Sequence, residues 1–381
     1  MKVALVIKEF VSQKGGGEKY TVDLCRELLK LGHQVHVFAN RYQVDGCDRA
    51  VFHRVTMVRS VSFLKVLTFP AMVRRGLKKE KFDLIYGLTQ IYPQDVHFLG
   101  GGLQRIWLAL KYPRPFRRRL ALITPLHLAL GALEKRIFQP NNYRRIIANS
   151  QLCRQQLVEH YRVPAEKIDV VYNGVDTDRF TPQVREKFRR SVRSRYQLGP
   201  EEILLLFVAH NFARKGLGTI ISALGSLKET ESSYRLLVVG SGRPGPFIRQ
   251  AKELGVADRI IFTGASRAIE QFYGAADIFL LPTMYDPFAS VCLEAMACGL
   301  PVVTTKHNGA AEIITDKDLV LADPSDSRDL AKKILHLSHA PIREEIGKRG
   351  REMACRLTIA SVGRRTEGIL LDVLREKRGE E

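Results

Sequence analysis

The fold is indicated most clearly by residues 203–240, which begin ILLLFVAHNFARKGLGTIISALGSLKE (203–229) and go on to YRLLVVG (234–240). An uninterrupted apolar run is typical of a buried strand, and here a glycine-containing loop and a helix-periodic segment lead to the next such run. The same alternation continues through FIRQAKELG (247–255), IIFTG (260–264), AIEQFYGAA (268–276) and IFLLP (278–282). Strict alternation of strand and helix predicts a parallel sheet covered by helices on both faces.

The first forty residues repeat this pattern. We expect a strand in KVALVI (2–7), a glycine loop in QKGGGEKY (13–20), a helix in TVDLCRELLKLG (21–32) and a second strand in HQVHVFAN (33–40). Val22, Leu24, Leu28, Leu29 and Leu31 form an approximately helical stripe, and Gly32 is a suitable stop. Further strands are expected at residues 83–87, 95–99, 145–149 and 168–172.

The chain is therefore expected to be an α/β protein with two doubly wound, Rossmann-like domains. The first covers residues 1–175 and the second residues 176–360, where the charged, weakly periodic stretch 176–200 supplies the linker and the first helix. The last helix, 361–378, is expected to pack back on the N-terminal domain.

Composition excludes several classes of protein. The 381 residues include 45% apolar residues, which excludes a disordered chain, collagen and a coiled coil. The six cysteines are scattered without a C-x-x-C pair, which argues against a disulfide framework or a zinc site. Lys8 and Glu9 interrupt the apolar start, so no signal peptide is expected. The longest apolar tract, residues 120–133, is shorter than the roughly 20 residues of a spanning helix.

The net charge of +20 is unevenly distributed. Between Gly101 and Ser150 there are ten Lys or Arg residues and one acid, Glu134, interleaved with aromatic residues. This mixture suits a surface that lies on an anionic membrane or binds a phosphorylated acceptor, although a solvated basic loop over a buried helix would have the same composition. The predicted patch consists of Arg105, Trp107, Lys111, Arg114, Arg117, Arg118 and Arg119.

Three segments are candidates for ligand binding. Gly15, Gly16 and Gly17 lie between a strand and its helix, where open amides favour an anion, but a tight turn without a ligand fits equally well. Arg214 and Lys215 follow the strand at 203–210, where open α/β sheets bind ligands, and could clamp a diphosphate. A solvated basic loop is the plainer interpretation.

The third segment is DPFASVCLE, residues 286–294. A helix beginning near Pro287 would present first-turn amides at Ala289 and Ser290 to sugar hydroxyls or phosphate oxygens. Glu294, two turns along, could then accept hydrogen bonds from ribose hydroxyls. A surface helix capped by Asp286 is the alternative.

The ordered set GGGEKY, IANSQLCRQQLVEHY, VVYNGVDTDRFTP, NFARKG, VVGSG, FTG and DPFASVCLEAMACGLPVVTT resembles the family 4 glycosyltransferases. The resemblance spans about residues 2–374 and implies the GT-B fold, in which two Rossmann-like domains face a central cleft. Within the family the chain is most similar to bacterial lipopolysaccharide core glucosyltransferases. The resemblance implies a retaining hexosyltransferase that uses a nucleotide diphosphate sugar, usually UDP-linked, as a substrate, with no cofactor and no bound metal.

The resemblance also assigns roles to residues. Arg214 and Lys215 match the basic pair that neutralises the departing diphosphate, and Glu294 matches the acid that binds ribose. The amides near Phe288, Ala289 and Ser290 match the sugar and phosphate cradle, and the loop at Gly16 matches one that faces the phosphate from the other domain. Four further positions are expected to line the nucleotide pocket: Gly240, Gly242, Gly264 and Ala265.

Two departures bear on catalysis. The family commonly has Glu where this chain has Asp286, so the carboxylate that reaches the sugar is one methylene shorter. The core glucosyltransferases carry an Asp near the position of Gly101 as a candidate for acceptor activation. Asp95 or His97 could substitute, but a histidine in a strand is more often packed or hydrogen-bonded.

The expected partners are a nucleotide diphosphate sugar, a lipid-linked or phosphorylated glycan acceptor such as a lipopolysaccharide core, and an anionic membrane surface. The expected location is cytoplasmic, peripheral on the cytoplasmic face of the inner membrane. Two alternatives are a nucleic-acid-binding or scaffold protein, which only the charge supports since no nucleic-acid motif is present, and a GT-B phosphorylase-type enzyme.

Overall fold

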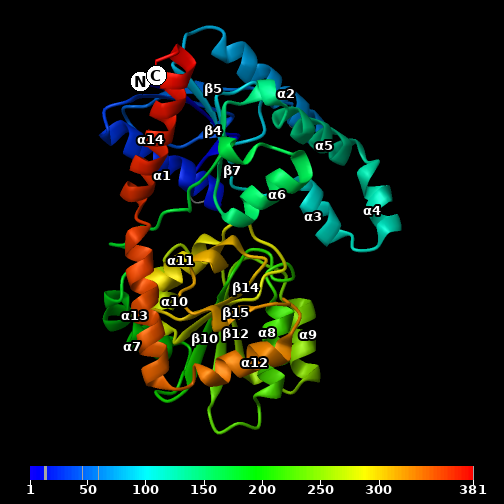
Figure 1. The fold of residues 1–381 in the computed structure, drawn as a ribbon. Coiled ribbons are helices and arrows are strands. Elements are labelled where there is room, and N and C mark those ends of the chain that lie inside the picture. The colour runs from blue at the N-terminus through cyan, green and yellow to red at the C-terminus, as the bar shows by residue number, and fades with distance from the viewer. Residues whose placement is uncertain (13–14, 45, 59, 381) are drawn as a thin grey trace. The chain divides into compact units, whose positions relative to one another are not determined.

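The computed structural model describes residues 1–12, 15–44, 46–58 and 60–380 (Figure 1). The chain forms two compact units. The N-terminal unit comprises Met1–Gly174 together with the chain from Ile359 onward, and the C-terminal unit is Val175–Thr358. The first boundary lies one residue from the position expected from the sequence.

The N-terminal unit is built on a seven-stranded sheet in the order β5-β3-β1-β6-β7-β8-β9, with every neighbouring pair parallel. Strands β2 and β4 form a separate two-stranded parallel sheet. The strands are β1 Lys2–Val6, β2 Glu9–Phe10, β3 Gln34–Ala39, β4 Arg41–Tyr42, β5 Val51–Arg54, β6 Leu84–Gly87, β7 Val96–Leu99, β8 Arg145–Ala148 and β9 Ile168–Val170.

Side chains of the central strand β1 alternate between two apolar layers. Val3 and Leu5 pack in a core that includes Leu28 of helix α1, whereas Ala4 and Val6 pack in a second core that includes Phe69 of helix α2. This burial on both faces explains why β1 is apolar from Val3 to Val6. The helices of this unit are α1 Gly16–Lys30, α2 Ser62–Leu77, α3 Gln104–Lys111, α4 Pro115–Leu122, α5 Pro125–Ile137, α6 Gln151–Tyr161 and α14 Ile359–Arg378.

Helix α14, drawn in red in Figure 1, returns to the N-terminal unit and packs beside α1. Val362, Leu370 and Val373 are buried in the same core as the α1 residues. At the end of the helix, Lys377 Nζ lies 3.0 Å from Asp95 Oδ2. The last helix therefore belongs to the N-terminal unit through both apolar packing and an ion pair.

The C-terminal unit contains a six-stranded parallel sheet in the order β12-β11-β10-β13-β14-β15. The chain thus adds strands first on one side of β10 and then on the other, as in a doubly wound nucleotide-binding sheet. The strands are β10 Ile203–Val208, β11 Tyr234–Val239, β12 Ile260–Gly264, β13 Ile278–Leu281, β14 Val302–Thr305 and β15 Val320–Leu321. The helices are α7 Gln183–Arg195, α8 Leu217–Ser226, α9 Gly245–Glu253, α10 Glu270–Ala275, α11 Ser290–Ala297, α12 Ser327–His336 and α13 Ala340–Arg356.

Several predicted boundaries differ from the structure. Helix α1 begins at Gly16 rather than at Thr21, since the glycines form its first turn. The apolar tract 120–133 is divided between α4 and α5, because Pro125 starts a new helix. Among the described residues, no helix is both long and apolar enough to cross a membrane.

Candidate active site

The candidate donor site lies at the carboxyl ends of the C-terminal strands. In this sheet the topological switch point falls between β10 and β13, which pair with each other while their crossovers lead to opposite sides. Open α/β sheets bind ligands in the crevice at such a point. The loop after β10 carries Arg214 and Lys215, and the loop after β13 carries Asp286.

The two loops are joined by backbone contacts. The Arg214 carbonyl oxygen accepts hydrogen bonds from Met284 N at 2.9 Å and from Thr283 Oγ1 at 3.2 Å. Gly216 has φ +85°, and a Cβ there would lie 2.0 Å from the Pro282 carbonyl oxygen. A glycine is thus required for the basic pair to approach the neighbouring loop so closely.

Lys215 is 9% exposed and forms an ion pair with Asp286 through its ammonium group and Oδ2. Burial, and then the charge of Arg214, lower the pKa of Lys215 to about 7. The contacting Asp286 carboxylate favours the charged ammonium and so acts against the lowering of the Lys215 pKa by burial. Burial also lowers the pKa of Arg214, whose Nη1 lies 3.5 Å from the Tyr285 carbonyl oxygen. Two partly desolvated cations at a switch point are suited to an anion with two negative phosphates.

The start of α11 differs from the prediction. The helix begins at Ser290, not near Pro287, because the preceding residues are held extended against the segment after β14. Asn308, 1% exposed, accepts from Ala289 N at 3.1 Å, and Asp286 Oδ1 accepts from Phe288 N at 3.1 Å. The amides of Phe288 and Ala289 therefore serve the loop itself and do not form the expected cradle, which leaves the helix start at Ser290 as the candidate.

Glu294 is the fifth residue of α11, one turn rather than two from the helix start. Its Oε2 accepts a hydrogen bond from the Tyr273 hydroxyl at 3.0 Å. That hydroxyl also lies 3.3 Å from the Val291 carbonyl oxygen. Burial and the Glu294 charge keep the pKa of Tyr273 well above its usual value, so the hydroxyl remains a donor. Tyr273 thus fixes the carboxylate, an arrangement that suits a ribose-binding acid.

Glycines lie at the carboxyl ends of β11 and β12, the strands on the β10 side of the switch point. Gly240 has φ +143°, and a Cβ there would lie 1.7 Å from the Ala209 carbonyl oxygen. A Cβ on Gly242 would lie 2.3 Å from the Phe212 ring. Gly264, with φ +77°, accepts from the Gly240 amide at 2.9 Å, and Ala265 is exposed after it. The residues predicted to line a nucleotide pocket are therefore brought together where the backbones of β10, β11 and β12 end.

The glycine loop of the N-terminal unit occupies the equivalent position after β1. Gly15 is the N-cap of α1, and Gly16 and Gly17 form its exposed first turn. The amino end of a 15-residue helix carries a partial positive charge. The segment retains the geometry of an anion site, and Gln13 and Lys14 of the predicted loop lie outside the described residues.

A lysine near this loop was not identified from the sequence. Lys8, just beyond β1, donates a hydrogen bond from Nζ to Gln90 Oε1 at 3.3 Å, and burial lowers its pKa. Gln90 follows β6, so the pair spans the switch point of the N-terminal sheet, between β1 and β6. No local pattern marks Lys8, because its position depends on the pairing of strands distant in sequence.

The structure does not support Asp95 and His97 as acceptor-activating groups. Asp95 precedes β7 and so lies at the opposite end of the sheet from the ligand-binding edge, where it accepts from Ile85 N at 2.8 Å and pairs with Lys377. His97 is 2% exposed, hydrogen-bonded to Gln94 at 3.0 Å, and burial lowers its pKa to about 4. Gly101 is exposed after β7, and a Cβ there would meet nothing within 4 Å.

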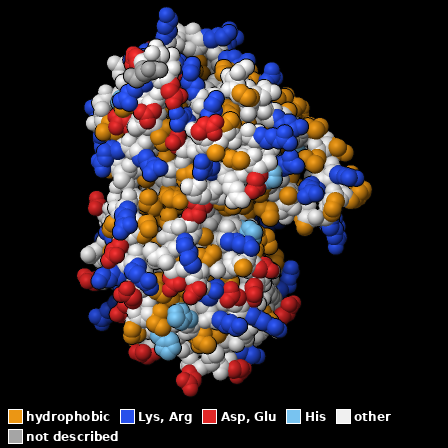
Figure 2. Space-filling model, viewed as in Figure 1, with side chains coloured by type: hydrophobic (Ala, Val, Ile, Leu, Met, Phe, Trp, Pro, Cys, Tyr) orange, Lys and Arg blue, Asp and Glu red, His pale blue; other side chains and the backbone are white. Residues whose placement is uncertain are grey.

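The predicted basic patch lies on α3, α4 and the turns that join them. Figure 2 shows basic and hydrophobic side chains intermixed over this part of the molecule. Exposed apolar residues accompany the basic ones, notably Phe116 at 72% and Ile123 at 67%. Residues of α3, α4 and α5 line a pocket of about 640 Å³, among them Arg105, Arg118 and Glu134. The Glu134 carboxylate accepts from Gln104 N at 2.6 Å and so caps α3.

Comparison with known families gives one match for each unit. The model described as Glycosyltransferase Family 4 matches residues 14–179, and the model described as Glycosyl transferases group 1 matches residues 188–353. Between them the two matches account for most of the chain.

Two individual proteins are similar to this chain over most of its length. The lipopolysaccharide glucosyltransferase WaaG of Escherichia coli K12 is 26% identical over 345 residues, which cover 89% of this chain and 91% of WaaG. An uncharacterised glycosyltransferase of Methanocaldococcus jannaschii, MJ1607, is 25% identical over 329 residues, covering 82% of this chain and 83% of its own.

Solved structures share the fold. The crystal structure of WaaG has a TM-score of 0.82 at 24% identity, covering 97% of this chain and 99% of WaaG. Anabaena HepE in complex with UDP has a TM-score of 0.74 at 20% identity, covering 98% of this chain and all of that chain. The fold of this chain is thus shared with both solved proteins.

Proposed function

Because the chain belongs to the family 4 glycosyltransferases and is a hexosyltransferase with the GT-B fold, we propose that it transfers glucose from UDP-glucose to a lipid-linked glycan acceptor of the lipopolysaccharide core type, with retention at the anomeric carbon. The observation that carries this proposal is the buried ion pair between Lys215 and Asp286 at the switch point of the C-terminal sheet.

The pair and its neighbour Arg214 supply what transfer from a diphosphate sugar requires. As the bond between the sugar and the phosphate breaks, negative charge builds on the departing diphosphate. Cations already fixed and partly desolvated at that position stabilise this charge without reorganising, which is the largest contribution that many enzymes make. Asp286 contacts the Lys215 ammonium directly and so orients it. In this proposal the same carboxylate also accepts a hydrogen bond from a sugar hydroxyl.

Acceptor activation needs no protein base in this scheme. With retention, a phosphate oxygen of the departing diphosphate takes the proton of the acceptor hydroxyl, while the new bond forms on the face that the leaving group vacates. This fits a chain in which Asp95 pairs with Lys377, His97 is hydrogen-bonded to Gln94, and Gly101 carries no side chain. Positioning and electrostatics then account for the rate.

The proposed donor and acceptor are taken from what similar proteins bind or are named for. HepE has been crystallised with UDP and with UDP-glucose, and WaaG is named as a lipopolysaccharide glucosyltransferase. In the N-terminal unit, Lys8 offers positive charge to an anionic acceptor. The exposed basic and apolar residues of α3 and α4 suit attachment to an anionic leaflet, and we place the enzyme on the cytoplasmic face of the inner membrane.

The proposal is tested by titrating the protein calorimetrically with UDP-, GDP- and ADP-glucose and with UDP-galactose. We expect UDP-glucose to bind most tightly. Proton NMR of the product formed with a truncated lipopolysaccharide acceptor should then show that the anomeric configuration of the donor is kept. A protein that binds none of these sugars, or that inverts the anomeric centre, would overturn the proposal.

A further inference from the structure

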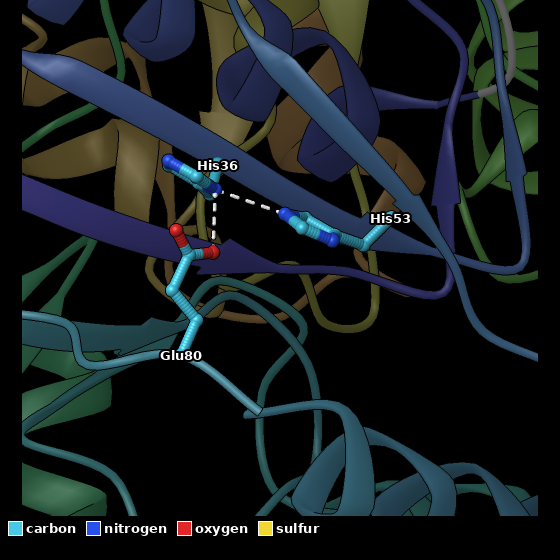
Figure 3. A group of neighbouring side chains, drawn as sticks. All are labelled: His36, His53 and Glu80. Atoms are coloured by element: carbon cyan, nitrogen blue, oxygen red, sulfur yellow. Dashed lines mark hydrogen bonds and ion pairs between the residues drawn. The ribbon is translucent and has the colours of Figure 1, made fainter. Parts of the chain in front are cut away.

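Two histidines and a glutamate converge on the α2 face of the N-terminal sheet. His36 comes from β3, His53 from the edge strand β5 and Glu80 from the segment after α2. Figure 3 shows the two imidazoles and the carboxylate turned toward one another. Neither the sequence pattern nor the proposed transfer reaction accounts for this cluster.

The three side chains present close-set ligand atoms. His36 Nδ1 lies 2.9 Å from His53 Nε2 and 3.4 Å from Glu80 Oε2, and all three ligand atoms fall within 4.8 Å of one another. Atoms that share one metal ion at about 2.1 Å are separated by distances of this size. Two imidazole nitrogens and one carboxylate oxygen are ligands that zinc-type ions favour.

The surroundings hold the two imidazoles in place. The His53 ring stacks on Phe38 with centroids 4.3 Å apart, and the Phe82 ring meets His36 edge-on at 5.1 Å. His36 is only 7% exposed, whereas the Glu80 side chain is 38% exposed. His36 thus lies on the inside, His53 is half-buried and Glu80 faces solvent, which gives an ion a path of entry.

We propose that His36, His53 and Glu80 form a structural site for a divalent transition-metal ion of the zinc type, with water completing the coordination. The site joins an edge strand, its neighbour and the segment after α2. A bound ion would therefore stabilise the folded N-terminal unit, and the more so the higher the affinity and concentration of the ion. We assign it no part in sugar transfer, since none of its three residues belongs to the loops that follow the carboxyl ends of β1 and β6.

Lys2 makes the proposal specific. Its ammonium pairs with Oε1 of the Glu80 carboxylate, whose Oε2 faces His36, and so competes with a metal ion for the negative charge of that carboxylate. Removing that ammonium should strengthen metal binding, whereas removing a ligand should weaken it. A chance collection of surface histidines would not respond in opposite directions to these two changes.

The test uses untagged protein titrated with Zn²⁺ by calorimetry and with Co²⁺ by visible absorption. We expect one ion per chain, a rise in thermal stability with Zn²⁺, and a loss of affinity of at least about tenfold in both His53→Ala and Glu80→Gln. Lys2→Gln should bind the ion more tightly than the wild type. Glu80→Gln alters only a partly exposed side chain, so it remains informative if His53→Ala folds poorly.

Cys355→Ala and His160→Ala serve as controls, because an exposed thiol and another imidazole of the same unit are the competing ligands. Both controls should bind Zn²⁺ as the wild type does. The proposal is overturned if wild-type protein binds neither ion, if the controls abolish binding, or if Glu80→Gln and Lys2→Gln leave the affinity unchanged.

Discussion

The Lys215 ammonium and the Asp286 carboxylate form an ion pair between the loops that follow β10 and β13, the two strands that flank the switch point of the C-terminal sheet. Neither loop adopts its position alone. Gly216 permits the close approach, and Asn308 holds the segment after Asp286 extended. The pair therefore reports on the geometry of the whole donor site, and changes at or around it have distinct expected effects.

Arg214→Met should lower kcat by about 100-fold or more, since it removes a donor that we propose to face the departing diphosphate. The donor KM should change less than kcat, because the charge that Arg214 meets grows as the bond breaks. Steady-state kinetics with UDP-glucose measure both constants. Lys228→Met, at an exposed residue of the same unit, is the matched control and should retain full activity. Equal losses in the two variants would contradict the assignment.

Asp286→Asn should move the loss of activity to lower pH. Burial and the charge of Arg214 already lower the pKa of Lys215 to about 7 in the native protein, and removal of the contacting carboxylate should lower it further. Because the charged ammonium is the active form, kcat/KM of the wild type should fall as pH rises through about 7. That of the variant should begin to fall at lower pH. Profiles of the same shape for both proteins would show that Asp286 does not stabilise the ammonium.

Glu294→Gln should weaken donor binding by about tenfold, because an amide is a poorer acceptor for two ribose hydroxyls than a carboxylate. Tyr273→Phe should have a smaller effect of the same kind, since it removes the hydroxyl that fixes Glu294. Donor KM and calorimetric affinity should change together. If Tyr273→Phe proved the more damaging, Tyr273 itself and not Glu294 would be the group that meets the nucleotide.

Asp95→Ala should lower the free energy of unfolding by about 1 to 3 kcal/mol and leave turnover by folded protein unchanged. It removes the acceptor for the partly buried Ile85 amide and the partner of Lys377. Urea denaturation followed by circular dichroism measures the first quantity, and kinetics normalised to folded protein the second. A stable variant with little activity would return Asp95 to a catalytic role.

Replacing Arg117, Arg118 and Arg119 together with Ser should weaken binding to vesicles with anionic lipid by about a hundredfold, at roughly 1 kcal/mol per basic residue. Sedimentation with phosphatidylglycerol vesicles measures this. The matched control replaces Arg75, Lys78 and Lys79, three exposed residues of the same unit with the same total charge. If both triple variants lost the same affinity, net charge rather than this surface would be responsible.

Strands buried on both faces were the features that sequence predicted best. VALVI (3–7) and ILLLFV (203–208) are apolar without interruption, which identifies them without knowledge of their neighbours. Lys215 lies after β10, as predicted, because the end of an apolar run is easily recognised.

The errors have a common cause, which is dependence on residues distant in sequence. The start of α11 is set by the Asn308 side chain, 19 residues beyond the Ala289 amide that it accepts from. Asp95 is committed to Lys377, 282 residues away, and Lys8 to Gln90 across two strands. Such contacts follow from strand order and helix docking, which no local pattern of apolar residues specifies.

Calorimetric titration of UDP into wild-type protein and into Lys215→Met tests the central claim most directly. The methionine preserves the length and packing of the side chain but removes the charge. We predict that the wild type binds UDP with one site per chain and that the folded variant, verified by circular dichroism, binds at least about tenfold more weakly. Equal affinity in the two proteins, or a wild type that does not bind UDP, would contradict the placement of a nucleotide diphosphate at the switch point.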